Sequence, residues 1–120
     1  MSDVRKVPAG ELLPAEGSPG VSREAAVVLD GVWSGRALTE PGVTSGWHHH
    51  GEHETVVYVL RGAFRVETAD GVVEAAPGDF VHVPAHVVHR EGNPSAETAE
   101  VVLVRTGSGP VVVNVDSARG

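Results

Sequence analysis

Short valine-rich segments, separated by glycine and proline, fill most of the chain. In one of them Phe64 and Val66 alternate with Arg65 and Glu67, which gives one apolar and one polar face. A period of two residues is typical of a β-strand. The same reasoning predicts strands over residues 25–29, 32–39, 45–49, 55–61, 63–68, 72–76, 80–83, 98–106 and 111–115. Short strands in this number predict an all-β sandwich or barrel.

Turn residues mark two hairpins inside this pattern. Arg-Gly at 61–62 separates VVYVL from AFRVE, and Asp-Gly at 70–71 separates the latter from VVEAA. Asp-Gly is a strong signal for a two-residue hairpin turn. Residues 22–29 leave an alternative open, because Ser22 could cap a short helix while the valines that follow also suit a strand.

The beginning of the chain differs from the remainder. Residues 1–20 are rich in proline and glycine and poor in large apolar side chains, which predicts an extended arm. Residues 21–120 then form a single barrel domain, since a chain of 120 residues and 12.5 kDa has the size of one folding unit. Valine-dense strands place apolar side chains on both faces of a sheet, so we expect a homodimer formed by sheet-face packing or by exchange of the arm.

Composition excludes several classes of function. The chain has no cysteine, which removes disulfides, thiol catalysis and thiolate zinc sites. It carries 9 Lys+Arg against 16 Asp+Glu, a net charge of −7, and no basic cluster, so no nucleic acid partner is expected. No apolar run is long enough for a membrane span or a signal peptide, so we expect a soluble, cytoplasmic protein with no membrane partner.

Histidines carry the candidate chemistry. His48 and His50 point the same way in a strand, whereas His49 points to the opposite face. Two imidazoles that converge with a third, from His89 in another strand, make a site for a first-row divalent metal ion. Because cysteine is absent, any metal site must use His, Asp or Glu.

The spacing of these residues resembles the cupin superfamily over residues 42–93. The first cupin motif, Gly-x5-His-x-His-x3,4-Glu-x6-Gly, is answered by Gly42, His48, His50, Glu54 and Gly62. The second, Gly-x5-Pro-x-Gly-x2-His-x3-Asn, is matched by Gly78, Pro84, His89 and Asn93, with His86 in place of the middle glycine. The resemblance implies a double-stranded β-helix, or jelly-roll barrel. It also implies one divalent metal ion per chain (Fe, Mn, Ni or Zn), bound by His48, His50, His89 and Glu54.

The glutamate departs from the family pattern by one residue. Seven residues rather than six separate Glu54 from Gly62, and Thr55 stands where the spacing expects the glutamate. Because side chains alternate between faces, this offset turns Glu54 away from the metal unless a β-bulge corrects it. His53 could then approach instead, or three histidines could bind the metal together with water.

The resemblance implies a metal-dependent enzyme that acts on a small molecule. A three-histidine site without a carboxylate resembles cupin dioxygenases that cleave β-diketones, so oxidative cleavage of a metal-chelating carbonyl or enol compound is the leading hypothesis. An isomerase, a lyase and a non-catalytic, metal-stabilised ligand-binding protein are the alternatives. No acid–base pair is evident beyond the ligands, so no catalytic residue is assigned. An anionic ligand could pair with Arg36, Arg65, Arg90 or Arg105, although strand arginines more often lie on the solvated outer face.

Overall fold

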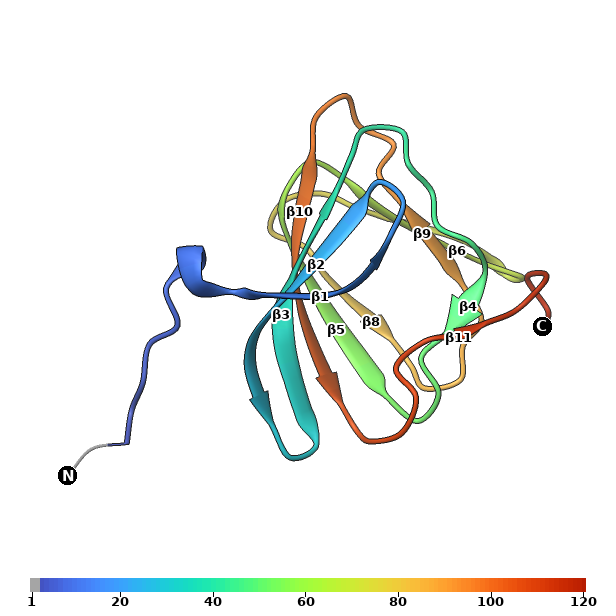
Figure 1. The fold of residues 1–120 in the computed structure, drawn as a ribbon. Helices are drawn as coiled ribbons and strands as arrows, with labels where there is room; N and C mark the ends of the chain where they lie inside the picture. Colours follow the sequence, from blue (N-terminus) through green and yellow to red (C-terminus); the bar gives the residue numbers. More distant parts are fainter. Residues whose placement is uncertain (1–2) are drawn as a thin grey trace.

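The chain folds into a barrel of antiparallel strands, seen in a computed structural model that describes residues 3–120 (Figure 1). A turn of 3-10 helix, η1 (Ala9–Glu11), comes first. The strands are β1 (Leu13–Ser18), β2 (Val21–Leu29), β3 (Val32–Thr39), β4 (His48–His49), β5 (Glu54–Arg61), β6 (Phe64–Thr68), β7 (Gly71–Ala75), β8 (Phe80–Val83), β9 (Arg90–Gly92), β10 (Ala99–Thr106) and β11 (Val113–Asn114). This confirms the predicted all-β, double-stranded β-helix. No helix among the described residues is long and apolar enough to cross a membrane.

Two walls of strands face each other across the barrel. One is a six-stranded sheet with the order β1-β2-β3-β10-β5-β8. The other contains β7-β6-β9, and isolated bridges from Thr44 to Gly92 and from His48 to His89 attach the β4 segment to its β9 edge. β11 pairs with β4 on the far side. The barrel therefore closes through the segment that carries the clustered histidines.

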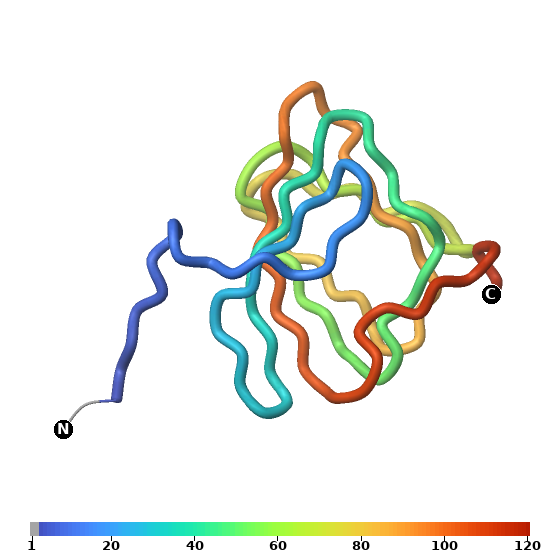
Figure 2. Tube along the Cα trace, in the orientation of Figure 1, coloured from blue at the N-terminus to red at the C-terminus, as the bar shows by residue number. Residues whose placement is uncertain are grey.

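Every predicted strand overlaps an observed one, and residues 21–29 form β2, so the helix alternative there is wrong. Two strands were not predicted. β9 is a three-residue strand with the sequence REG, and β1 has the sequence LPAEGS within the stretch expected to be an arm. Backbone pairing with a neighbour, rather than an apolar pattern, forms both. Residues 3–12, which include η1, lead away from the barrel (Figure 2).

The core lies between the two walls at one end of the barrel. Alternation in β5 turns Val57 and Val59 inward, where both are almost completely buried. Each such valine stabilises the fold by about 1.5–3 kcal/mol. The other members of the core cluster are Ala37, Phe64, Val66, Ala75, Val101 and Leu103. The opposite end of the barrel is polar.

Two turns need a left-handed backbone. Gly62 has φ +76°, and a Cβ atom there would lie 2.6 Å from Ala99 Cα, so only glycine fits. His86 also has a positive φ, 64°, at the position where the cupin motif has its middle glycine. The left-handed conformation costs a residue with a side chain about 1–2 kcal/mol, which explains why glycine suits this position.

An apolar surface, defined by Val56, Tyr58, Phe80 and Val104, lies on the outside of the six-stranded sheet. Tyr58 packs against Phe80, with ring centroids 4.7 Å apart, yet Phe80 remains 72% exposed. Val56 and Val104 are direct cross-strand neighbours and are also exposed. A contiguous apolar surface of this kind is a common site of protein association.

The homodimer stays a prediction, and this surface allows a direct test of it. Light scattering at micromolar concentration should give twice the chain mass of 12.5 kDa. Phe80→Glu should return the mass to one chain, because it places a charge in the apolar contact. Val73→Glu, at an exposed valine of the other sheet, is the matched control. A monomeric unmodified protein would contradict the prediction. A dimer that resists Phe80→Glu but is lost when residues 1–12 are deleted would assign the contact to the arm.

Candidate metal centre

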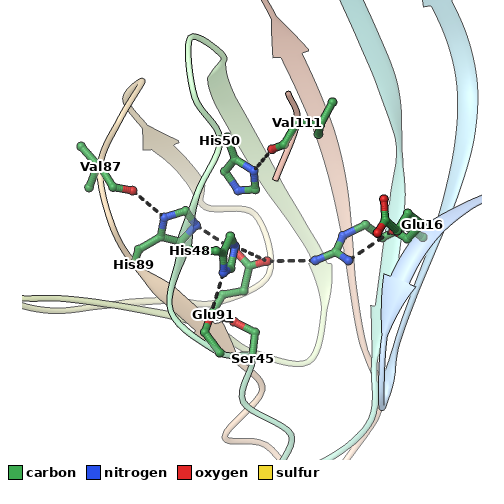
Figure 3. Close-up of polar contacts among 10 residues, drawn as sticks. Glu16, Ser45, His48, His50, Val87, His89, Glu91 and Val111 are labelled. Carbon is green, nitrogen blue, oxygen red and sulfur yellow. Dashed lines mark hydrogen bonds and ion pairs between the residues drawn. The ribbon is translucent and has the colours of Figure 1, made fainter. Parts of the chain in front are cut away.

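Three histidines meet inside the barrel at its polar end (Figure 3). His48 lies on β4, His50 follows two residues later, and His89 pairs with His48 through reciprocal backbone hydrogen bonds of 2.9 and 2.8 Å. All three side chains are buried. Their ring centroids are 4.5–5.0 Å apart. The structure thus brings together the three histidines that the sequence selected.

Backbone carbonyl groups fix how each ring is protonated. The Nδ1 atoms of His48, His50 and His89 lie 2.8, 2.7 and 2.9 Å from the carbonyl oxygens of Gly46, Val111 and Val87, respectively. A carbonyl oxygen only accepts a hydrogen bond, so Nδ1 carries the proton and Nε2 keeps its lone pair. The Nε2 atoms of His48 and His89 are buried without a hydrogen-bond partner. Histidines that bind metals are usually oriented in this way.

A carboxylate completes the cluster, and it comes from Glu91 on β9. Its Oε2 atom lies 3.4 Å from His89 Nε2, and its Oε1 atom lies 3.9 Å from His48 Nε2. One ligand atom from each of His48, His50, His89 and Glu91 falls within 4.8 Å of the others. The sequence analysis missed Glu91. The signal was its position two residues after His89, which puts both side chains on one face of a strand, as with His48 and His50.

The structure does not bring Glu54 to this cluster. β5 pairs with β8 without a bulge from Thr55 onward, so Thr55 takes the inward position and Glu54 faces outward. The Glu54 carboxylate bonds instead to His82 Nε2, at 2.6 Å, and accepts a hydrogen bond from the Ala85 amide, at 2.9 Å. These donors lower the pKa of Glu54. No bulge corrects the one-residue offset in the motif, and Glu54 therefore faces away from the cluster.

His53 is also separate from the cluster, although it is buried beside Thr55. Its Nε2 atom donates to the Gly109 carbonyl oxygen at 3.1 Å, while its Nδ1 atom has no partner. The other three histidines lie outside as well. His49 Nδ1 accepts from the Gly51 amide, His82 contacts Glu54, and His86 contacts Glu52.

Burial sets the charge of the cluster. Desolvation lowers the pKa of His48, and it lowers the pKa of His50 to about 3. Burial acts in the opposite sense on Glu91, but contact with His89 and His48 and the charge of Arg23 hold its pKa below the ordinary range. Arg23 Nη2 lies 3.3 Å from Glu91 Oε1. At neutral pH the site therefore holds at least two neutral imidazoles and an ionised carboxylate, which is the form that binds divalent cations.

The fold and the site together define a small jelly-roll protein with a buried His/Glu cluster that could bind a metal ion. Residues 35–105 match the family of the Cupin domain, so the chain belongs to the cupin family. This confirms the resemblance found in the motifs. No curated protein matches the sequence.

Several solved structures share the fold. A cupin-superfamily sugar phosphate isomerase from Silicibacter pomeroyi is 23% identical with a TM-score of 0.78, covering 94% of this chain and 83% of that one. The polyketide cyclase RemF from Streptomyces resistomycificus is 19% identical with a TM-score of 0.79, covering 95% and 87%. KdgF from Halomonas sp. is 21% identical with a TM-score of 0.73, covering 88% and 96%. At these identities the likeness describes the fold alone.

The low pKa of His50 predicts how stability changes with pH in the metal-free protein. Below pH 6.5 the unfolded chain binds a proton at His50, whereas the folded chain does so only near pH 3. The free energy of unfolding therefore falls as the pH falls through this range, by about 2 kcal/mol between pH 7 and pH 5 for this one group. Urea unfolding with a chelator present measures it. His50→Gln should flatten the dependence and His49→Gln should not; equal slopes in all three proteins would contradict the assignment.

Proposed function

We propose that this protein is a metal-dependent enzyme that binds a small oxygen-rich compound at the cluster and converts it by isomerase- or lyase-type chemistry. The observation that carries the proposal is the convergence of buried imidazoles whose Nδ1 atoms are already hydrogen-bonded. Their Nε2 lone pairs and the Glu91 carboxylate point to a common centre. Buried polar atoms without partners are costly, which argues for a ligand that satisfies them.

The donor set fits a first-row divalent ion. His48, His50, His89 and Glu91 would hold it, and imidazole with one carboxylate suits Fe, Mn, Ni or Zn. Such an ion supplies Lewis-acid polarisation of a bound carbonyl or enol oxygen. The protein orients the three rings through carbonyl groups, keeps His48 and His50 neutral by burial, and holds Glu91 in place through Arg23. The preformed geometry limits the reorganisation that binding requires.

Glu91 changes which reaction class we favour. The expectation of oxidative cleavage rested on a three-histidine site without a carboxylate, and Glu91 supplies that carboxylate. Related structures with described activities include a sugar phosphate isomerase, a polyketide cyclase and an oxalate decarboxylase, and none of these is named as an oxygenase. We therefore place proton-transfer chemistry next to a carbonyl group ahead of dioxygenase chemistry, and a non-catalytic ligand-binding role after both.

Metal content tests the cluster directly. The purified protein loaded with Mn, Zn, Ni or Fe should retain about one ion per chain after desalting. His48→Ala, His50→Ala and His89→Ala should each lower retention at least tenfold, because each removes one donor. His82→Ala removes a histidine outside the cluster and is the matched control. Full retention in all three cluster variants would overturn the assignment.

The two glutamates give opposite expectations. Glu91→Gln should weaken metal binding by about tenfold or more, because an amide oxygen is a poorer ligand than a carboxylate. Glu54→Gln should leave metal binding unchanged, because Glu54 lies on the outer face beside His82. Titration of each apo variant with Zn against a fluorescent chelator measures both affinities. A larger loss in Glu54→Gln than in Glu91→Gln would restore the ligand set inferred from the motif.

The reaction class is tested by running the same substrates with and without oxygen. Metal-loaded protein is incubated in D₂O with hydroxy-carbonyl and 1,3-dicarbonyl compounds and followed by proton NMR. Deuterium incorporation or isomerised product under nitrogen supports the proposal. Turnover only in air, with oxygen uptake, would show dioxygenase chemistry instead. Binding without turnover in either atmosphere would show a ligand-binding protein.

A further inference from the structure

An arginine lies inside the barrel beside the candidate metal centre, and the proposed function gives it no role. Arg105 is on β10, where residues 101, 103 and 105 alternate inward, and only 4% of Arg105 is exposed. Sequence analysis grouped Arg105 with three other arginines as possible outer-face residues. Those three face carboxylates: Arg36 pairs with Glu24, Arg65 with Glu74 and Arg90 with Glu67. Arg105 alone among the four is buried.

Arg105 also forms no ion pair within the described chain, and the Glu91 carboxylate attracts it only through space. Its Nε atom is buried without a hydrogen bond, and no ion pair joins it to any of residues 3–120. Its guanidinium carbon lies 5.4 Å from the centre of the Trp33 ring, a weak cation–π contact. A charge taken out of water without a counter-ion costs several kcal/mol. A fold tolerates such a group most readily where a ligand supplies the missing charge.

A cavity of about 180 Å³ adjoins this arginine. Its lining consists of Ala15, Glu16, Arg23, Trp33, Arg105, Val111 and Val112. Arg23 also lines a second cavity of about 120 Å³, and His48 is another of its lining residues. Val111, whose carbonyl oxygen accepts a hydrogen bond from His50, lines the first cavity, and Arg23 and Val112 line both cavities. The space beside Arg105 therefore adjoins residues that contact the histidine cluster.

The charges around this space favour a monoanion. Arg23 and Arg105 contribute two positive charges, and the Glu91 carboxylate, paired with Arg23, offsets one of them. Glu16 also lines the cavity, but it is exposed, and no ion pair joins its carboxylate to any of residues 3–120. In the metal-free protein the buried groups therefore leave one positive charge, which matches a carboxylate better than a phosphate dianion. The planar guanidinium also fits the two oxygens of a carboxylate.

We infer that Arg105 and its cavity form a carboxylate-binding subsite, so that the substrate of the metal centre is a small carboxylic acid. Arg105 takes the carboxylate, Trp33, Val111 and Val112 surround the adjoining carbon atoms, and a second oxygen of the same molecule reaches the cluster. The cavity volume suits a compound of a few carbon atoms rather than a drug-sized ligand. The inference rests on the proposed function for its second contact, but the carboxylate contact stands without a metal.

Calorimetric titration of the full-length protein tests the subsite, with pyruvate and its neutral analogue pyruvamide as probes. Metal-free protein should bind pyruvate saturably and bind pyruvamide and inorganic phosphate at least tenfold more weakly. Metal-loaded protein should bind pyruvate more tightly still. Equal binding of pyruvate and pyruvamide, or no pyruvate binding in either form, would overturn the inference. Pyruvate binding that the metal does not strengthen would leave the subsite in place and count against the proposed function.

A substitution separates a binding role from a structural one. Arg105→Met keeps the length of the side chain and removes an unpaired buried charge, so the variant should unfold at the same temperature as the parent or higher. It should nevertheless lose pyruvate affinity at least tenfold while retaining its metal. Arg105→Lys should recover part of that affinity, and Arg65→Met, at an outer-face ion pair, should change nothing. Unchanged pyruvate affinity in a folded Arg105→Met, or a variant that no longer folds, would show that Arg105 is structural.

Discussion

A single pair of backbone hydrogen bonds positions the whole polar end of the barrel. His48 and His89 exchange amide and carbonyl bonds across two segments of chain that are distant in sequence. In an antiparallel pair, side chains directly opposite each other share a face, and residues two positions along share it too. His50 and Glu91 each follow a bridged histidine by two residues, so the same register that aligns the two rings delivers the other two donors. A shift of one residue in either segment would turn its two donors away from the other two.

The sequence predicted the strands well because their signal is local. Alternation and turn residues identify β5, β6 and β7 without knowledge of their neighbours. β1 and β9 were not predicted, because backbone pairing with a neighbouring strand forms them and the charged sequence of β9 has no apolar face. The histidine trio was found from motif spacing. Glu91 was not, because its role depends on which strand lies opposite it, and Glu54 was placed among the ligands by a motif whose spacing this chain does not keep.

The two ends of the barrel serve different purposes. Along β5 the inward positions change from Thr55 to Val57 and Val59, so one strand passes from polar interior to close-packed core. At the polar end the Thr55 hydroxyl, His53 Nδ1 and Arg105 Nε are buried without partners. Each such atom costs about 1–3 kcal/mol. The apolar end supplies the stability that makes this arrangement tolerable, which is the usual relation between a scaffold and a preorganised site.

The segment after β10 is both a wall of the cavity and a support for the rings. The Val111 carbonyl oxygen orients His50, the Gly109 carbonyl oxygen holds His53, and β11 pairs with β4. Displacing this segment outward would therefore widen the path to Arg105 and at the same instant free the His50 imidazole to rotate. Entry of a solute and exchange of any ion that the cluster held would then share one motion, and a molecule bound against Val111 would slow the departure of such an ion.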